Sequence, residues 1–297
     1  MTSLIDTLRN ALGDAYQVEH ELEGGGMARV FVATESALGR RVVIKVLPPE
    51  LSETVSADRF HREIRVAASL QHPHIVPVLS AGRAGHLLYY TMPLVEGETL
   101  RTRLAREGEL PVTEACRILA EVSRALSHAH HHGIVHRDIK PENILLSQGQ
   151  AQVADFGIAK ALTVAAGAES LTTTGLVLGT PAYMAPEQAA GGAEADPRAD
   201  IYALGVVGYE MLTATPPFSD RTPQALMAAH AVRRPESLSD RRPAAPARLA
   251  ALVMRMLEKH PADRPQSADE VLHELEAVAV QTAPTTVTEG YRGKIRR

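Results

Sequence analysis

The sequence is poor in cysteine, long apolar runs and excess positive charge, and each deficit excludes a class of protein. The single cysteine, Cys116, cannot form an internal disulfide and fits a reducing compartment. No apolar run reaches the roughly eighteen residues of a membrane helix, and residues 1–6 lack the basic start and apolar core of a secretory signal. A formal net charge of -4 provides no attraction for nucleic acid or an anionic membrane. We therefore expect a cytoplasmic protein without membrane insertion and without a nucleic-acid partner.

The apolar content is sufficient for folded lobes with cores of their own. The chain has 297 residues, of which 45% are hydrophobic. Helical spacing predicts a short helix over residues 3–12 and another over residues 56–70. Short β-branched runs between Tyr16 and Val46 predict antiparallel strands. A further strand pair is predicted around Ile75–Ser80 and Leu87–Pro93, and helical patterns dominate after Gly97.

The most informative stretch reads His136-Arg137-Asp138-Ile139-Lys140-Pro141-Glu142-Asn143, and Asp155-Phe156-Gly157 begins twelve residues after its end. An acidic residue, a lysine and an amide at this spacing can hold a substrate hydroxyl, a transferring phosphoryl group and a metal within one small volume. The segment therefore indicates phosphoryl transfer, and it resembles the catalytic and metal-binding loops of protein kinases.

Other landmarks of eukaryotic-like protein kinases follow in the order of that family, so the resemblance covers roughly residues 14–278. They are Gly24-Gly25-Gly26, Val42-Val43-Ile44-Lys45, Glu63, Gly179-Thr180-Pro181, Ala185-Pro186-Glu187, Asp200 and Arg264. The segments Gly25-Gly26-Met27 and 69–76 are similar to the bacterial Ser/Thr kinases in particular.

The resemblance implies an α+β, two-lobe protein kinase fold. A small antiparallel β-sheet and one main helix would form the N-lobe, and a larger C-lobe would be mainly helical. The expected divisions are an N-lobe with its short N-terminal helix at 1–93, a hinge at 94–97, a C-lobe at 98–280 and a tail at 281–297. The tail is predicted to be disordered because it is Thr-rich and lacks apolar periodicity.

The nucleotide is expected to bind between a glycine-rich turn, a lysine-bearing strand and the hinge. A glycine-rich turn lets backbone N–H groups approach phosphate oxygens. By resemblance, Lys45 binds the α- and β-phosphates and pairs with the helix carboxylate Glu63. The ATP-binding residues implied by the resemblance are Glu23, Gly24, Gly25, Gly26, Met27, Ala28, Arg29, Val30, Val43, Lys45, Glu63, Met92, Pro93, Val95 and Leu145.

The glycine-rich turn departs from the family pattern G-x-G-x-x-G. Glu23 and Ala28 stand at the first and third glycine positions, and only Gly25 matches. A carboxylate about 8 Å from the triphosphate would cost about 0.5 to 2 kcal/mol, unless Glu23 points to solvent or pairs with a cation such as Arg29. We expect an altered but usable loop.

At the phosphoryl-transfer end, the resemblance assigns four residues. Asp138 accepts or orients the hydroxyl proton of the substrate, and Lys140 neutralises charge on the γ-phosphoryl group. Asn143 and Asp155 bind Mg²⁺, with Mn²⁺ as an alternative, because hard oxygen ligands suit these cations. A lysine two residues after Asp138, together with Thr180, is typical of Ser/Thr kinases. The expected function is transfer of the γ-phosphoryl group of Mg·ATP to Ser or Thr hydroxyls of protein substrates.

The long segment between Asp155 and Glu187 fits an activation loop. By resemblance, Thr172 and Thr174 are autophosphorylation sites, Arg137 pairs with the phosphate, and a homodimer is a candidate arrangement for phosphorylation in trans. Glu187 and Arg264 are expected to form a buried ion pair, and the Asp200 carboxylate is expected to hold the backbone of the catalytic loop.

Three alternatives compete with parts of this interpretation. The departures at Glu23 and Ala28 also fit a pseudokinase that binds nucleotide without turnover. A small-molecule kinase shares the core chemistry, but those relatives generally lack the Ala185-Pro186-Glu187 element. His128 and His132, one helical turn apart, suggest a metal site, but polar residues at this exposed helix end need no metal to explain them.

Overall fold

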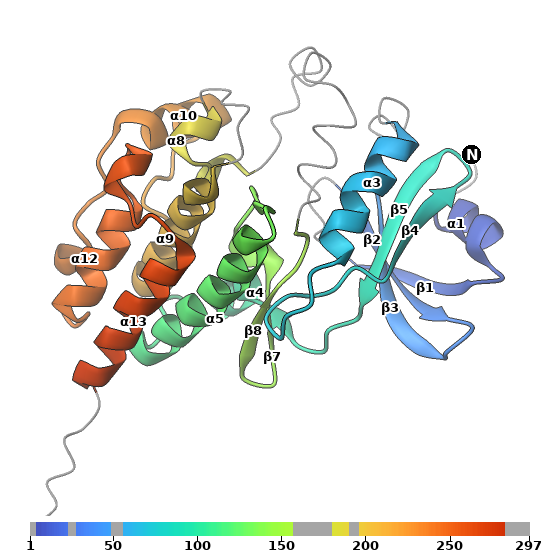
Figure 1. Cartoon of the computed structure of the whole chain (residues 1–297), viewed down its shortest axis with the longest axis horizontal. Helices are drawn as coiled ribbons and strands as arrows, with labels where there is room; N and C mark the ends of the chain where they lie inside the picture. Colours follow the sequence, from blue (N-terminus) through green and yellow to red (C-terminus); the bar gives the residue numbers. More distant parts are fainter. Residues whose placement is uncertain (1–3, 23–27, 49–55, 157–179, 190–195, 283–297) are drawn as a thin grey trace, which may run out of the picture.

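The computed structural model describes residues 4–22, 28–48, 56–156, 180–189 and 196–282. Figure 1 shows two lobes: a β-sheet with two helices on one side of the molecule and a helical lobe on the other, with the short strands β7 and β8 between them. Among the described residues, no helix combines the length and apolarity needed to cross a membrane.

The N-lobe is built on one antiparallel five-stranded sheet, in the order β1-β2-β3-β5-β4. Its strands are β1 (Tyr16–Leu22), β2 (Arg29–Glu35), β3 (Arg40–Val46), β4 (Ser80–Ala84) and β5 (Leu87–Pro93). The β-branched runs form β2 and β3, and each strand buries three consecutive side chains, Phe31–Ala33 and Val42–Ile44. The predicted strands between Tyr16 and Val46 are thus confirmed.

One predicted strand is wrong. The partner of β5 is Ser80–Ala84, and the preceding segment from Ile75 bridges to the C-lobe instead of the sheet. The Val76 N–H donates to the Val153 carbonyl over 2.9 Å. This backbone donor of the apolar run is therefore paired with the C-lobe and is not available to the N-lobe sheet. The small residues of β4 form a strand because the tight turn at Gly85, with φ of 64°, returns the chain onto β5.

Two helices cover the sheet. Helix α1 (Leu4–Leu12) buries Leu8 and Leu12 in a cluster with the β-sheet side chains Phe31 and Ile44. Helix α3 (Ala57–Ala68) buries Phe60 and Ile64 together with Tyr90 of β5. Both helices lie where the periodicity of apolar residues predicts them.

The C-lobe is mainly helical. Its helices are α4 (Leu100–Glu107), α5 (Val112–His131), α8 (Pro186–Ala189), α9 (Pro197–Thr213), α10 (Pro223–Val232), α11 (Leu238–Arg241), α12 (Ala247–Met256) and α13 (Ala268–Thr282), with 3-10 turns η1 (Pro141–Asn143), η2 (Pro181–Tyr183) and η3 (Pro261–Asp263). Its small sheet has the order β6-β7-β8, from β6 (Glu98–Thr99), β7 (Ile144–Ser147) and β8 (Gln150–Val153). Helix α9 is apolar on nearly all sides and is buried accordingly.

The last helix begins at a capping signal formed by Ser267 and Glu270. The Ser267 hydroxyl accepts the Glu270 backbone N–H over 3.1 Å, and the Glu270 carboxylate accepts the Gln266 N–H over 2.7 Å. Helix α13 ends at Thr282. The C-lobe was predicted to end at residue 280, so the helix includes the first two residues that were assigned to the tail. The remainder of the predicted tail, 283–297, lies outside the described residues.

Candidate functional site

An apolar cluster joins the two lobes at the predicted nucleotide site. Its buried members are Val43, Val76, Met92 and Ala154, and its partly buried members are Val30, Leu94, Val95 and Leu145. The cluster therefore brings together five side chains that the sequence assigns to ATP binding, four from strands of both lobes and Val95 from the segment between β5 and β6. Pro93, also assigned there, ends β5 opposite Val42.

The glycine-rich turn is only partly described. Residues 23–27, which include Glu23 and the three glycines, lie outside the described residues, and Ala28 is the first residue after them. The Arg29 guanidinium is paired with Glu21 through bonds of 2.7 and 2.5 Å, and it lies over the Phe31 ring. Because Val30 lies on the opposite face of β2, the Arg29 side chain does not line the apolar cluster. The assignment of Arg29 as a nucleotide contact stays a prediction.

Lys45 has a different partner from the one predicted. Its Nζ lies 2.5 Å from Asp155 Oδ2, and no ion pair joins Lys45 to Glu63 in the part of the chain that the structure describes. A lysine in an apolar strand needs an anion, and Asp155 supplies it. The predicted Lys45–Glu63 pair is therefore wrong in this structure, and half-buried Glu63 lies on α3.

Asp155 is held as an anion in a special backbone conformation. Burial opposes ionisation, but the Lys45 ammonium and the hydrogen bonds from Lys45 and Tyr90 outweigh it, so the pKa of Asp155 lies below its usual value. Its φ of 70° is in the left-handed region, which non-glycine residues seldom adopt. The neighbouring Phe156 ring packs edge-on against His136 with centroids 4.7 Å apart, which anchors this turn in the core.

The catalytic-loop residues converge through direct bonds. Lys140 Nζ lies 2.7 Å from Asp138 Oδ2 and donates to the Thr180 hydroxyl over 2.9 Å. Asn143 Nδ2 donates to the Asp138 carbonyl over 2.8 Å and to its carboxylate over 3.2 Å. The arrangement places an acid, a cation and an amide together beside the start of η2.

The buried carboxylate of Asp200 fixes the backbone of this loop, as predicted. It accepts the N–H groups of His136 and Arg137 over 2.8 and 2.7 Å, and the His130 ring nitrogen lies 2.9 Å away. Burial raises the pKa of Asp200, but these bonds and the nearby histidines outweigh it and leave the pKa lowered. The bonds hold Arg137 at φ of 69°, a strained value that turns the loop.

Both ring nitrogens of His136 have structural partners. Its Nδ1 accepts the Asp138 N–H over 3.2 Å, so its Nε2 is the nitrogen that donates to the Ala154 carbonyl, at 2.9 Å. The fully buried ring thus links the catalytic loop to the residue before Asp155. This geometry gives His136 a scaffold role in the catalytic loop.

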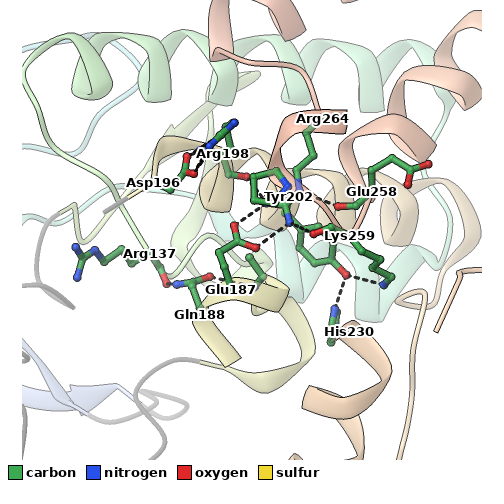
Figure 2. A network of polar contacts seen from close by, with 12 residues as sticks. Arg137, Glu187, Gln188, Asp196, Arg198, Tyr202, His230, Glu258, Lys259 and Arg264 are labelled. Atoms are coloured by element: carbon green, nitrogen blue, oxygen red, sulfur yellow. Dashed lines mark hydrogen bonds and ion pairs between the residues drawn. The ribbon is translucent and has the colours of Figure 1, made fainter. Parts of the chain in front are cut away.

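The predicted ion pair below the site is confirmed. The buried Arg264 guanidinium binds both carboxylate oxygens of Glu187, at 2.7 and 2.8 Å. Figure 2 shows this pair beside Tyr202, with the Arg137 side chain directed away from it and the Arg137 carbonyl bonded to Gln188. The predicted phosphosites Thr172 and Thr174 lie outside the described residues.

Sequence reasoning did not single out two residues beside the site. Tyr90 donates its hydroxyl to Asp155 Oδ1 over 2.8 Å. Arg101 bonds to Glu142 at 2.8 Å and to Glu210 at 2.7 Å, and it also bonds to the Tyr183 hydroxyl. The sequence carries no distinct signal for Tyr90, because Tyr89 and Thr91 beside it in strand Leu87–Pro93 also carry hydroxyls. Arg101 had no local signal, because its partners come from distant segments.

The histidines at the end of α5 stack on one another. The His128 ring lies 4.5 Å from the His132 ring and 5.1 Å from the His72 ring, between centroids. Burial, followed by the neighbouring histidines, lowers the pKa of both His128 and His72. Within the described ranges, no group of three or more His, Cys, Asp or Glu residues is arranged to hold a metal ion.

Comparison with known proteins gives a consistent family. The family described as protein kinase domain matches residues 16–275. Serine/threonine-protein kinase PknB of Mycolicibacterium smegmatis is 41% identical over 279 residues, which cover 92% of this chain and 44% of the relative. Serine/threonine-protein kinase pkn3 of Myxococcus xanthus is 40% identical over 273 residues, which cover 89% and 50%. This chain thus spans half or less of the length of these relatives.

A solved structure supports the same fold. The crystal structure of Rad53 1–466 in complex with AMP-PNP has a TM-score of 0.72 and 25% sequence identity, with 89% of this chain and 65% of that chain covered. The predicted two-lobe architecture is confirmed, and with the family matched over residues 16–275, this chain belongs to the protein kinase domain family.

Proposed function

We propose that this chain transfers the γ-phosphoryl group of Mg·ATP to Ser and Thr hydroxyls of proteins. The observation that carries the proposal is the convergence of Asp138, Lys140 and Asn143 through direct bonds, beside an apolar cluster and the Lys45–Asp155 pair. The names of the bacterial relatives support the same activity. The bond from Lys140 to Thr180 supports a Ser/Thr acceptor.

The chain's own residues suggest the course of the reaction. Asp138 accepts the proton of the substrate hydroxyl while the hydroxyl oxygen forms a bond to the γ-phosphorus. The bond from that phosphorus to the β–γ bridging oxygen breaks, and ADP leaves with the electron pair. Lys140 offsets the negative charge on the transferring group. Lys45 has three N–H donors, of which one is used by Asp155, so others are available to phosphate oxygens.

The donor set fits a magnesium ion. Asp155 provides a carboxylate that is ionised at neutral pH, and Asn143 directs its amide nitrogen to Asp138, which leaves its amide oxygen as a hard ligand. Mg²⁺ bound there would offset phosphate charge. Mn²⁺ prefers similar ligands and is the alternative cation.

The division into lobes gives each part a role. We propose a hinge at 94–97, since β5 ends at Pro93 and β6 begins at Glu98. The N-lobe at 1–93 and the C-lobe at 98–280 then enclose the nucleotide. Autophosphorylation at Thr172 and Thr174 with Arg137 as the phosphate partner, a homodimer for phosphorylation in trans, and a cytoplasmic location stay predictions.

Intact-mass analysis of the dephosphorylated protein with ATP and Mg²⁺ tests the proposal. We expect added phosphates in the wild type, mapped to Thr172 or Thr174, and a decrease of about 10² to 10⁴ in transfer rate for Asp138→Asn. Wild-type protein that binds ATP but transfers phosphate neither to itself nor to a generic protein substrate would contradict the proposed activity and favour a pseudokinase.

A further inference from the structure

The Asp155 carboxylate receives hydrogen bonds from two neighbouring strands. Lys45 of β3 binds Oδ2 at 2.5 Å, and the Tyr90 hydroxyl of β5 binds Oδ1 at 2.8 Å. Lys45 and Tyr90 are direct register partners in the antiparallel pair, so their side chains emerge side by side on one face of the sheet. The two donors therefore reach the two carboxylate oxygens as a matched pair.

The Tyr90 ring is fixed in the core of the N-lobe. Only 2% of Tyr90 is exposed, and its ring belongs to the cluster of Phe60, Ile64 and Leu88 beneath α3. A buried hydroxyl is costly unless it is hydrogen-bonded, and Asp155 supplies the acceptor. With its ring packed, Tyr90 has little freedom to direct the hydroxyl elsewhere.

The two donors differ in what else they serve. Under the proposed function Lys45 also binds phosphate oxygens, whereas among the described residues the Tyr90 hydroxyl bonds only to Asp155. A carboxylate oxygen has two acceptor sites, so Oδ1 can accept this hydrogen bond and retain one lone pair for a cation. Loss of a hydrogen-bond donor that orients a metal-binding carboxylate typically weakens metal affinity 10- to 100-fold.

We propose that Tyr90 is a positioning residue: its hydroxyl holds the Asp155 carboxylate in the orientation that binds Mg²⁺ with the nucleotide. This inference rests on the proposed function. It predicts that removal of the hydroxyl weakens metal binding specifically, while the nucleotide affinity without metal is unchanged, because the apolar cluster that would hold the base does not include Tyr90.

The test compares Tyr90→Phe with Tyr89→Phe in the full chain. Tyr89 is the adjacent tyrosine of β5, and its ring packs against the cluster on the other face of the sheet, which makes it a matched control. Calorimetric titration of ADP is performed at increasing Mn²⁺ and Mg²⁺ concentrations and without metal, and Mn²⁺ binding is followed independently by electron paramagnetic resonance.

For Tyr90→Phe we expect a metal affinity weaker by about tenfold, metal-free ADP affinity equal to the wild type, and a transfer rate restored by saturating Mg²⁺. Partial unfolding would lower the number of binding sites and leave their affinity unaltered, so the affinity reports on the hydroxyl. A metal affinity of Tyr90→Phe equal to that of Tyr89→Phe, or tighter, overturns the inference. Wild-type protein whose ADP binding is independent of metal contradicts the proposed function instead.

Discussion

Asp200 illustrates at the residue scale how one buried carboxylate supports the site. It is 1% exposed and accepts two backbone N–H groups of the catalytic loop. In Asp200→Asn the amide nitrogen would face one of these donors, so we expect the free energy of unfolding to fall by about 3 kcal/mol. Urea denaturation measures this loss, and the transfer rate should decrease with it because the loop loses its support.

Asp196→Asn provides the control for this prediction. Asp196 caps helix α9, which also carries Asp200, by accepting the Arg198 N–H over 2.9 Å. Asparagine is an equally good N-cap residue. We expect a loss below about 1 kcal/mol. Equal losses for Asp200→Asn and Asp196→Asn would show that the buried bonds to the loop do not set the stability of this region.

The sequence reveals site residues that lie within one motif more readily than contacts between distant segments. Asp138, Lys140 and Asn143 lie within one motif, and the structure brings them together. Asp155 was also identified, but its bond to Lys45 was not, because the choice between two carboxylates depends on the placement of α3. The hydroxyl of Tyr90 reaches Asp155 across 65 residues of sequence, a contact that only the fold specifies.

At the scale of elements, helix α10 is attached to the C-lobe through a buried histidine. The His230 ring is fully buried between Tyr202 and Phe218, with its Nδ1 2.8 Å from the Tyr202 hydroxyl. Figure 2 shows His230 and Lys259 on either side of that hydroxyl. Burial, followed by the charge of Lys259, lowers the pKa of His230 from 6.5 to about 4.

This lowered pKa predicts acid sensitivity. As the pH falls from 6.5 to about 4, the unfolded chain binds a proton at His230 that the folded chain does not. The free energy of unfolding should therefore decrease through this window, by about 2 to 3 kcal/mol in total from this group. In His230→Gln the decrease should be smaller by that amount, as measured by urea denaturation at several pH values.

His86→Gln is the matched control, because His86 lies exposed in the turn between β4 and β5. It should retain the slope of the wild type between pH 6.5 and 4. Identical slopes for His230→Gln and the wild type would contradict the assignment of the buried ring as the acid-sensitive group.

Element boundaries followed from sequence where composition and main-chain pairing agree. The amphipathic helix Ala57–Ala68 was predicted to within two residues, and the β-branched strand Arg40–Val46 lies within the region predicted to form strands. Strand Ser80–Ala84 was not, because its small residues have weak strand propensity. The apolar run at Ile75 was mistaken for that strand because burial between two lobes and burial in one sheet give the same hydrophobic pattern.

At the scale of the whole molecule, the described residues join the two lobes through few main-chain contacts. Val153 of β8 accepts the Val76 N–H and donates to the His74 carbonyl, at 2.9 Å in each case. The chain between β5 and β6 also connects the lobes, and Gly97 there has φ of 149°. A Cβ atom at Gly97 would lie 2.1 Å from the Leu146 carbonyl oxygen of β7.

Gly97→Ala should therefore disturb both folding and nucleotide binding. Side chains are strained at this φ, and backbone atoms cannot yield as a flexible side chain would, so β6 must move away from β7. We expect the free energy of unfolding to fall by about 2 to 4 kcal/mol and the KM for ATP to rise several-fold, since Val95 and Leu145 lie on either side of this contact in the apolar cluster.

Gly85→Ala separates backbone strain from the clash. Gly85 has φ of 64°, and an added Cβ would meet no atom within 4 Å. Strain alone costs about 1 to 2 kcal/mol, and the KM for ATP should stay at the wild-type value because this turn lies at the far end of β5 from the hinge. Equal losses of stability in Gly97→Ala and Gly85→Ala, with the wild-type KM for ATP in both, would contradict this prediction. The close contact at Gly97 would then not couple the lobes to the nucleotide site.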